Sequence, residues 1–514
     1  MPDLRRLRMF LTMGHATLQA TTDALPERSV PHVESGAAFE DPAPLVVDLD
    51  GTLTPGDTLY ESMVHAIKHK PSVLLSLPLW LLRGKAELKA RLAEASGYSA
   101  DTLPLRGAFL AYLRDEQARG RRIILATAAH RSIAESVARR TGLFDEVLAT
   151  EGATNLKGET KLAAIRKQVG TRFAYAGDST ADLGIWHASA GAIVVGSPRG
   201  INSVRKEGRI EREFDREPAG PLVWMKALRV HQWTKNLLIF VPLLTSFSLF
   251  NISSVVAAVL AFAAFSCAAS ATYLINDLLD LESDRSHPRK CERPLAACRI
   301  GIPQALAAAA GLMVVAAVLA LAVGPAFALL LGTYVVLTSA YTWLLKHYVL
   351  MDVLMLATLY TLRIAAGSVA IGVTLSSWLL AFSVFMFLSL ALVKRCSELV
   401  ALQQVSRRKT SGRDYNVQDL VVLWPMGVGA GLCSVVVFGL FISTPEMQSR
   451  YGTPELMWLV GIALLYWLGR LWIKTSRGEM HDDPIVFALR DYGSRVTIAA
   501  SIAFTIAAHA FRLP

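Results

Sequence analysis

The chain has 514 residues, of which 53% are hydrophobic and only 18% are charged, and it carries a formal net charge of +10. This length exceeds that of one ordinary soluble domain, and the composition indicates that a large part of the chain is not soluble. A positive charge would suit a nucleic-acid partner. However, apolar runs of near-membrane length follow one another from about Trp233 onward, and excess Lys and Arg usually mark the cytoplasmic loops between such runs. We therefore expect a membrane protein with no nucleic-acid partner.

The chain divides into a tail, a soluble domain, a linker and a membrane domain. Residues 1–43 contain basic side chains but no apolar core long enough for a signal peptide, so we interpret them as a flexible tail. Residues 44–200 have the composition of an α/β domain, and an insertion over about residues 57–120 is predicted to form a helical cap. The charged stretch 201–226 is predicted to be a linker, and residues 227–514 the membrane domain.

Three short apolar runs in the soluble domain predict strands that end in polar side chains, where parallel α/β sheets bind ligands. A carboxylate nucleophile needs a cation in order to approach an anionic phosphate, and Mg²⁺ held by further carboxylates supplies it. Threonine and lysine side chains can hold the phosphoryl oxygens. The candidates are Asp48 and Asp50 after the first run, Thr127 in the second, Lys161 at the start of a helix, and Asp178 and Asp182 after the third. This set predicts phosphoryl transfer.

The predicted cap contains an uncharged apolar run, residues 72–82, that is too short to span a bilayer. Two interpretations stay open. One is a buried cap helix. The other is a lid that rests on the membrane and admits a lipid-bearing phosphate to the site.

About nine spans fit the hydrophobic pattern of the membrane half. They cover approximately residues 236–250, 254–275, 304–323, 326–345, 353–372, 377–393, 418–442, 456–473 and 494–511. With the soluble domain in the cytoplasm, the loops on its side carry most of the Lys and Arg residues, which is the positive-inside pattern. We therefore predict a multi-pass protein of the bacterial inner (cytoplasmic) membrane.

Three carboxylates close the second predicted span. Asp277, Asp280 and Asp284 are spaced i, i+3, i+7 and fall on one helical face, directly after Asn276. Carboxylates crowded in this way repel one another unless cations lie between them, and Mg²⁺ bridging to phosphate oxygens is the usual resolution. Basic residues follow at once, and Arg289 and Lys290 are the first choices for binding a diphosphate leaving group.

The soluble domain resembles the haloacid-dehalogenase-like phosphatases, because the motifs DLDGTLTPGD, LATA, GETK and GDSTAD occur in that order. The resemblance implies a Rossmann-like α/β fold, with Asp48 as the nucleophile and Asp50 as the acid/base. It also implies that Thr127 and Lys161 bind phosphate, and that Asp48, Asp178 and Asp182 hold Mg²⁺.

The membrane half resembles the UbiA superfamily of transferases, whose signature NDxxDxxxD it carries, and this implies an all-α polytopic fold. Aromatic prenyltransferases of that superfamily have a second DxxxD motif between the fourth and fifth spans, where this chain has one aspartate, Asp352. Together with the segments HQWTKN, LVKRCSEL and DPIVFALRD, this departure makes the chain similar to the decaprenyl-phosphate phosphoribosyltransferase branch.

That resemblance implies transfer of 5-phosphoribose from phosphoribosyl pyrophosphate to a polyprenyl phosphate, with Mg²⁺ on the carboxylates. The fused phosphatase would then remove the 5-phosphate of the lipid product, which would serve as a pentose donor. An acceptor phosphate favours Lys, Arg or Tyr over a second acidic site. The acceptor-site candidates are Lys235, Tyr341, Lys346, Arg363 and Lys394.

Two alternatives of other classes remain open on the sequence. One is a prenyltransferase that uses a polyprenyl diphosphate and an aromatic acceptor. The other is a lipid-binding scaffold with an inactive phosphatase domain. The sequence is also compatible with a homo-oligomer.

Overall fold

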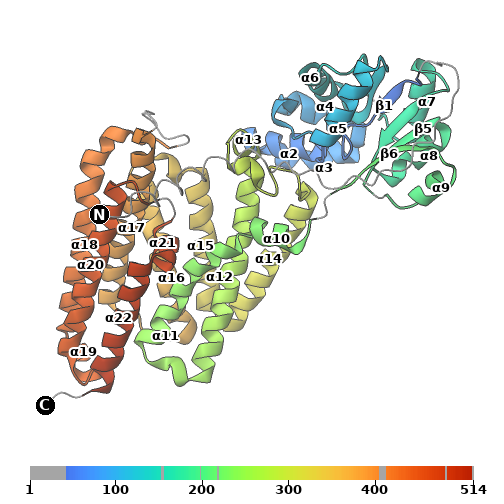
Figure 1. Ribbon diagram of the computed structural model, residues 1–514. Coiled ribbons are helices and arrows are strands. Elements are labelled where there is room, and N and C mark those ends of the chain that lie inside the picture. Colours follow the sequence, from blue (N-terminus) through green and yellow to red (C-terminus); the bar gives the residue numbers. More distant parts are fainter. Residues whose placement is uncertain are drawn as a thin grey trace, which may run out of the picture. The chain divides into compact units, whose positions relative to one another are not determined.

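A computed structural model describes residues 42–151, 155–196, 198–216, 219–404, 413–480 and 483–511. The tail predicted for residues 1–43 lies almost entirely outside these described residues. The described chain contains one α/β domain and a set of long helices, and Figure 1 shows both with their element labels.

The soluble domain is built on a six-stranded sheet in the order β3-β2-β1-β4-β5-β6, in which every neighbouring pair is parallel. Its strands are β1 (Leu45–Val47), β2 (Ile123–His130), β3 (Glu146–Thr150), β4 (Ala174–Gly177), β5 (Gly191–Val195) and β6 (Ile210–Phe214). The prediction of a parallel α/β domain is confirmed. The sequence placed residues 210–214 in the linker, but β6 is hydrogen-bonded along β5 and so belongs to the sheet.

Helices cover both faces of this sheet. Each face has its own apolar core. In the short central strand β1, Leu45 and Val47 point into one core cluster and Val46 points into the other. The first face is covered by α5 (Gly107–Ala118) and α6 (Arg131–Thr141), and the second by α7 (Glu159–Gln168), α8 (Leu183–Ala188) and α9 (Ile201–Lys206). Helix α5 lies in the predicted cap range but packs on the sheet. Both faces are therefore apolar, and the polar side chains gather at the strand ends.

The rest of the insertion forms a helical cap, as predicted. It consists of α2 (Thr58–His69), α3 (Val73–Leu82), α4 (Lys85–Ser96) and the 3₁₀ turn η1 (Ala100–Thr102). The three helices share a small core of their own, in which Ala66, Val73, Leu88 and Leu92 are buried. A separate core lets the cap form a unit of its own above the sheet's loops.

Seven helices in the described part of the membrane half are long and apolar enough to cross a membrane. They are α12 (Ile252–Leu279), α14 (Ile302–Val323), α15 (Pro325–Trp343), α16 (Met351–Ile371), α17 (Ser377–Gln404), α18 (Leu420–Ile442) and α20 (Met457–Ser476). The shorter helices are α10 (Pro221–Ala227), α11 (Val241–Thr245), α13 (Leu281–Arg285), α19 (Pro445–Arg450) and α21 (Pro484–Arg490). A further 19-residue helix, α22 (Tyr492–Ala510), coincides with the last predicted span and carries Arg495 near its start.

The first predicted span, residues 236–250, is not one helix. The segment is divided into the 3₁₀ helix η3 (Val230–Phe240), α11 and the 3₁₀ turn η4 (Ser248–Phe250). Pro242 at the start of α11 cannot donate a backbone hydrogen bond, and Phe247 adopts a left-handed conformation with φ 57°. Gly367 of α16 also approaches closely, because a Cβ there would lie 2.1 Å from the Ile239 carbonyl oxygen. Apolar composition alone did not reveal these breaks.

Helix α2 of the cap also contacts the membrane half. Its Glu61 carboxylate accepts two hydrogen bonds from the Arg285 guanidinium, at 2.6 and 3.0 Å, and both side chains are buried. One turn further on, His65 Nδ1 lies 2.6 Å from a carboxylate oxygen of Glu282. Both partners lie on α13, which directly follows Asp280 and contains Asp284 of the NDxxDxxxD motif.

Candidate active sites

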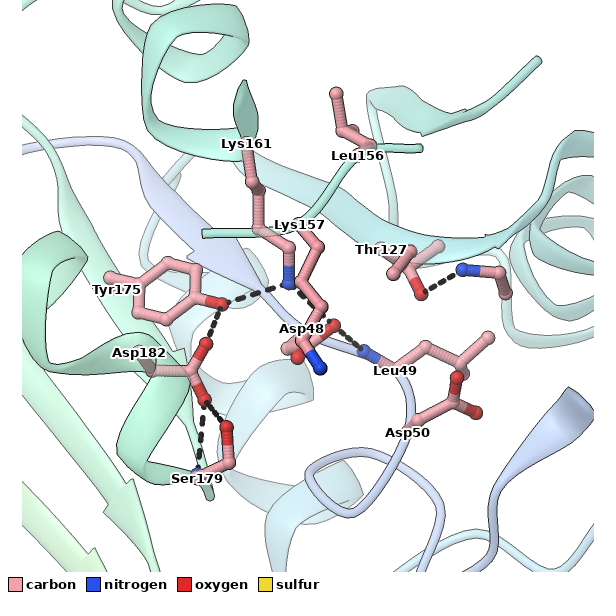
Figure 2. Close-up of polar contacts among 12 residues, drawn as sticks. Asp48, Leu49, Asp50, Thr127, Leu156, Lys157, Lys161, Tyr175, Ser179 and Asp182 are labelled. Atoms are coloured by element: carbon pink, nitrogen blue, oxygen red, sulfur yellow. Dashed lines mark hydrogen bonds and ion pairs between the residues drawn. The ribbon is translucent and has the colours of Figure 1, made fainter. Parts of the chain in front are cut away.

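The predicted phosphatase residues converge at the carboxyl ends of the central strands. Asp48 directly follows β1 and Asp178 directly follows β4, and these two strands pair with each other. Lys161 reaches from α7, and its Nζ lies 3.0 Å from Asp48 Oδ1 with both side chains largely buried. Figure 2 shows Lys161 directed at Asp48 and at the hydroxyl of Tyr175. The lysine supplies the positive charge that an anionic phosphate needs beside a carboxylate.

Three carboxylates of this site share a small volume. The ligand oxygens of Asp48, Asp178 and Asp182 all lie within 4.8 Å of one another. Burial, followed by the charge of Asp48, raises the pKa of Asp178 to about 7. A cation would relieve this repulsion, and a set of carboxylate oxygens fits a hard cation such as Mg²⁺. Asp182 is held in place by the hydroxyl groups of Tyr175 and Ser179, both at 2.8 Å.

The turn after β1 places Asp50 at the start of the cap. The Thr58 N–H and hydroxyl donate to its two carboxylate oxygens at 2.8 and 3.2 Å, so the side chain is fixed against the first turn of α2. Burial, with a further contribution from the Asp57 charge, raises the pKa of Asp50 to about 7. This value suits a group that must donate a proton and take it back near neutral pH. Gly51 makes the turn with φ +77°, and a Cβ there would lie 2.1 Å from Asp178 Oδ2.

Thr127 lies fully buried in β2, where its hydroxyl oxygen accepts the Ala129 N–H at 3.0 Å and can still donate to a phosphate. A side chain that sequence reasoning missed lies nearby. Lys89 of cap helix α4 donates to the Ala128 carbonyl at 2.5 Å and to Asn155 at 2.9 Å, and burial lowers its pKa. The motifs did not reveal it because it comes from the cap, and only the fold brings it to the strand ends.

In the membrane half, two of the three predicted carboxylates meet at one guanidinium. Arg293 Nη1 lies 3.2 Å from Asp277 Oδ1 and 2.5 Å from Asp284 Oδ2. A second arginine, Arg229, forms an ion pair with Asp277 and stacks over the Tyr273 ring. Asp280 ends α12 as its C-cap and is half-buried. Asp277 and Asp284 therefore face a position that already holds a cationic group. Sequence reasoning noted Arg293 only as one basic residue among several and missed Arg229.

A second polar group, in which cations outnumber carboxylates, lies around Tyr360 of α16. Lys235 and Lys394 lie 2.9 and 3.6 Å from the same oxygen of Asp483, and Tyr360 donates to that oxygen at 3.5 Å. Tyr360, Lys394 and Asp483 line a small cavity. Arg363, one turn along α16, places its guanidinium over the Tyr360 ring at 5.4 Å. Three cations and one carboxylate leave this group net positive.

Within the described residues, the Arg363 side chain donates its hydrogen bonds to neutral groups. The buried guanidinium donates to Asn236 at 2.9 Å, to the Leu359 carbonyl at 2.6 Å and to the Tyr334 hydroxyl at 3.0 Å. Asn236 in turn donates to Ser266 of α12 at 3.0 Å. The side chain is thus held firmly while its charge stays available to an anion, which is the arrangement expected of an intramembrane charge with a function.

The single aspartate of the predicted loop lies in the first turn of α16 and serves a different purpose. Asp352 is fully buried and accepts hydrogen bonds from Arg395 and from the Tyr415 hydroxyl, both at 2.5 Å. Arg395 also pairs with Glu398 and lies over the Tyr415 ring. Both carboxylate oxygens of Asp352 are therefore engaged by donors inside the helix packing.

The remaining predicted residues lie at the ends of the helices. The Asn276 amide donates to Thr342 at 3.2 Å, and Lys290 Nζ lies 4.0 Å from Asp284. Tyr341 shares a hydrogen bond with Arg413, whereas Lys346 is half-buried and Arg289 is exposed. Their assigned roles in substrate binding stay predictions.

The chain matches two known families. Residues 238–490 match the UbiA prenyltransferase family, and residues 45–186 match the haloacid dehalogenase-like hydrolases. An uncharacterised protein of Sinorhizobium fredii, y4nM, is 39% identical over 463 residues, which are 88% of each chain. The decaprenyl-phosphate phosphoribosyltransferase of Corynebacterium glutamicum is 32% identical over 241 residues, 46% of this chain and 73% of that one. The chain belongs to the UbiA family and carries a fused haloacid dehalogenase-like domain.

Among solved structures, a UbiA homologue from Archaeoglobus fulgidus bound to GPP and Mg²⁺ aligns with 55% of this chain and 99% of its own, at 16% identity and a TM-score of 0.43. The two family matches confirm both family resemblances drawn from the sequence, and the fold confirms the combination of an α/β domain with a helical membrane domain. Except for Arg229 and Lys235, which lie just before the matched range, the residues of the two polar groups fall within the UbiA match, and the Asp48 site falls within the hydrolase match.

Proposed function

We propose that the membrane domain is a Mg²⁺-dependent transferase that moves 5-phosphoribose from phosphoribosyl pyrophosphate to a polyprenyl phosphate. The observation that carries this proposal is the presence of two different polar groups, one with paired carboxylates and one in which cations outnumber the single carboxylate. One carboxylate pair suits a single metal-bound diphosphate, and one cationic group suits a phosphate acceptor. A polyprenyl diphosphate donor with an aromatic acceptor would leave the cationic group without a ligand. The relatives named decaprenyl-phosphate phosphoribosyltransferase support the same assignment.

The donor would bind at the end of α12. Asp277 and Asp284 fit a divalent cation, because their oxygens already converge on one guanidinium. When bound, Mg²⁺ would neutralise the diphosphate as it departs. Arg229 and Arg293 would then turn from the carboxylates to the diphosphate oxygens, which are the partners that a planar guanidinium binds best. These contacts strengthen as negative charge collects on the leaving group, so they favour the transition state over the bound substrate.

The acceptor phosphate would bind between Lys235, Arg363 and Lys394. Asp483 forms ion pairs with both lysines, and the more highly charged acceptor phosphate would displace it. The lysines would hold two phosphate oxygens and direct the third at the anomeric carbon. There the bond to the diphosphate oxygen breaks as the bond to the acceptor oxygen forms. The product carries both a lipid-linked phosphate and a ribose 5-phosphate.

We further propose that the fused domain removes this 5-phosphate. Asp48 would attack the phosphorus, while Lys161 and Thr127 hold the phosphoryl oxygens. Asp50, protonated at its raised pKa, would donate a proton to the leaving ribose oxygen and would later take one from the attacking water. The three buried carboxylates fit a Mg²⁺ ion, which when bound would shield the phosphate charge from Asp48. We place this domain on the cytoplasmic side of the bacterial inner membrane, where phosphoribosyl pyrophosphate is made.

The test supplies the purified full chain in lipid nanodiscs with labelled phosphoribosyl pyrophosphate, polyprenyl phosphate and Mg²⁺. We expect a ribosyl lipid, diphosphate and inorganic phosphate from the wild type. Asp48→Asn should accumulate the 5-phosphorylated lipid without releasing phosphate, and Asp277→Asn should form no lipid product. Asp101→Asn, which changes an exposed aspartate of the same domain, is the matched control. If Asp48→Asn released phosphate at the normal rate, the phosphatase assignment would be wrong.

The same experiment also tests the alternative donor, a polyprenyl diphosphate. Wild-type chain supplied with a polyprenyl diphosphate and 4-hydroxybenzoate should form no prenylated product. Turnover of that pair, together with no turnover of phosphoribosyl pyrophosphate, would overturn the transferase assignment in favour of the aromatic prenyltransferase.

A further inference from the structure

Helix α3 of the cap has two apolar faces, and the domain buries only one of them. Its ten residues, VLLSLPLWLL, contain no charged side chain. Val73 is buried, and Leu77 and Trp80 pack against the small core of the cap. On the other side Leu75 is 85% exposed and Leu82 is 86% exposed. The cap core is complete without these outer leucines, so they have no role in its packing.

The outer face is continuous. Leu74, Leu79 and Leu81 are also more than half exposed, and at helical spacing they extend the surface between Leu75 and Leu82. Single exposed leucines need no explanation on a soluble surface, but a contiguous apolar face marks a binding partner. The partner of this face must therefore be apolar over about three turns of helix.

The charged residues around this face indicate which kind of apolar partner it binds. Exposed cations lie immediately before the helix, at Lys68 and Lys70, and immediately after it, at Arg83 and Lys85. The sequence from residue 62 to residue 86 contains no aspartate or glutamate. An apolar face bracketed by cations, without a single carboxylate, is complementary to a surface that is apolar inside and anionic outside. A bilayer containing anionic phospholipid has this structure.

The cap is also held close to the membrane spans. Tyr60 and Val64 of α2 pack against the core formed by the ends of α12 and α14, both of which are candidate spans. Three residues separate α2 from α3, a length of chain that reaches at most about 10 Å. The apolar face therefore lies within a short reach of the ends of two spans.

We propose that α3 is an interfacial helix whose outer leucines insert into the phospholipid leaflet on the side of the hydrolase domain. The substrate consequence rests on the proposed function. Leu88 and Leu92 of α4 lie in the core beneath α3, and Lys89 between them reaches the phosphatase strand ends. A cap seated in the leaflet would receive a phosphate on a lipid tail without requiring the tail to leave the membrane.

The direct test is photocrosslinking in the full chain. A benzoylphenylalanine is introduced at position 75, and in a matched control at position 118, an exposed alanine on α5. Both proteins are irradiated in nanodiscs of phosphatidylethanolamine and phosphatidylglycerol, and adducts are identified by mass spectrometry. Lipid adducts at position 75 that exceed those at position 118 are the expected result. Equal labelling at the two positions, or crosslinks from position 75 to a second copy of the chain, would overturn the proposal.

A second measurement distinguishes the insertion of α3 into the membrane from the kind of substrate that the phosphatase site hydrolyses. The double variant Leu75→Glu/Leu82→Glu is compared with Ala111→Glu/Ala118→Glu, which adds the same charge to exposed positions of α5. Hydrolysis of the phosphoribosyl lipid should fall at least about tenfold in the leucine variant alone, since a leucine's burial energy exceeds this factor. Hydrolysis of p-nitrophenyl phosphate should be unchanged in both. Lipid adducts at position 75 in a chain that never hydrolyses the phosphoribosyl lipid would uphold the interfacial helix and overturn only the substrate consequence.

Discussion

Replacing Asp352 by asparagine tests whether this lone aspartate in the first turn of α16 is structural or a remnant of a second metal site. Asp352 and Arg395 are both fully buried, and the carboxylate takes one hydrogen bond from Arg395 and one from Tyr415. Removing one partner of a buried ion pair costs about 3–5 kcal/mol. Tyr415 can turn its hydroxyl to accept from the new amide, and Glu398 still pairs with the guanidinium. We therefore expect a cost near the lower end, about 3 kcal/mol.

This cost should appear as a lower thermal unfolding midpoint of the purified chain in nanodiscs. A loss of that size corresponds to a shift of roughly 3 °C in a protein of this size, because the entropy of unfolding grows with chain length. Asp414→Asn, which removes the same charge from an exposed position nearby, should leave the midpoint within about a degree because isolated surface changes rarely matter. The Mg²⁺ concentration that gives half-maximal transferase activity should be equal in all three proteins. The contrary result is an Asp352→Asn protein that has the unfolding midpoint of the wild type but needs a much higher Mg²⁺ concentration for half-maximal activity. In that case Asp352 would be a metal ligand and our interpretation would be wrong.

Four further predictions concern the two candidate active sites. Lys161→Met should lower phosphatase turnover by about 10²–10³-fold, because it removes the charge 3.0 Å from Asp48, and ribosyl transfer measured in the same sample should be unaffected. Gly51→Ala should abolish phosphate release, since its Cβ would displace Asp178, and a normal rate would show that the turn can adapt. Arg363→Met should raise the KM for polyprenyl phosphate at least about tenfold while the KM for phosphoribosyl pyrophosphate stays constant; a change in the donor KM instead would contradict the acceptor assignment. Chelation with EDTA should stop both reactions, and Mg²⁺ should restore both, which an assay of diphosphate and phosphate release would show.

The phosphatase half could be predicted closely from the sequence because its chemistry lies at strand ends. A short apolar run followed by an acidic side chain fixes both the element and the position of the group at the sheet edge. Asp48, Asp178 and Lys161 meet as this reasoning required. Lys89 could not be found in this way, because no local pattern reports that a cap helix folds back over a particular strand.

The membrane half was less predictable, for two physical reasons. Hydropathy measures apolar length but not helical continuity, so the breaks at Pro242 and Phe247 were missed. The position of a charged residue in the sequence also does not identify its ion-pair partner in the fold. Arg289 and Lys290 are the first choices from the sequence, whereas the fold brings Arg229 and Arg293 to Asp277. Arg229 lies before the first span, 48 residues from Asp277 along the chain.

Helix α2 combines two tasks within twelve residues. Its first turn holds Asp50 through Thr58, and its next turns present Glu61 and His65 to Arg285 and Glu282 of the membrane half. Inserting a single residue between these two sets would rotate one against the other by about 100°, so either the acid/base or the contact would be lost. The two domains of this chain are therefore coupled by more than proximity. The length of α2 sets the position of Thr58 beside Asp50 and of Glu61 and His65 beside α13 together, so an insertion in α2 would affect both domains.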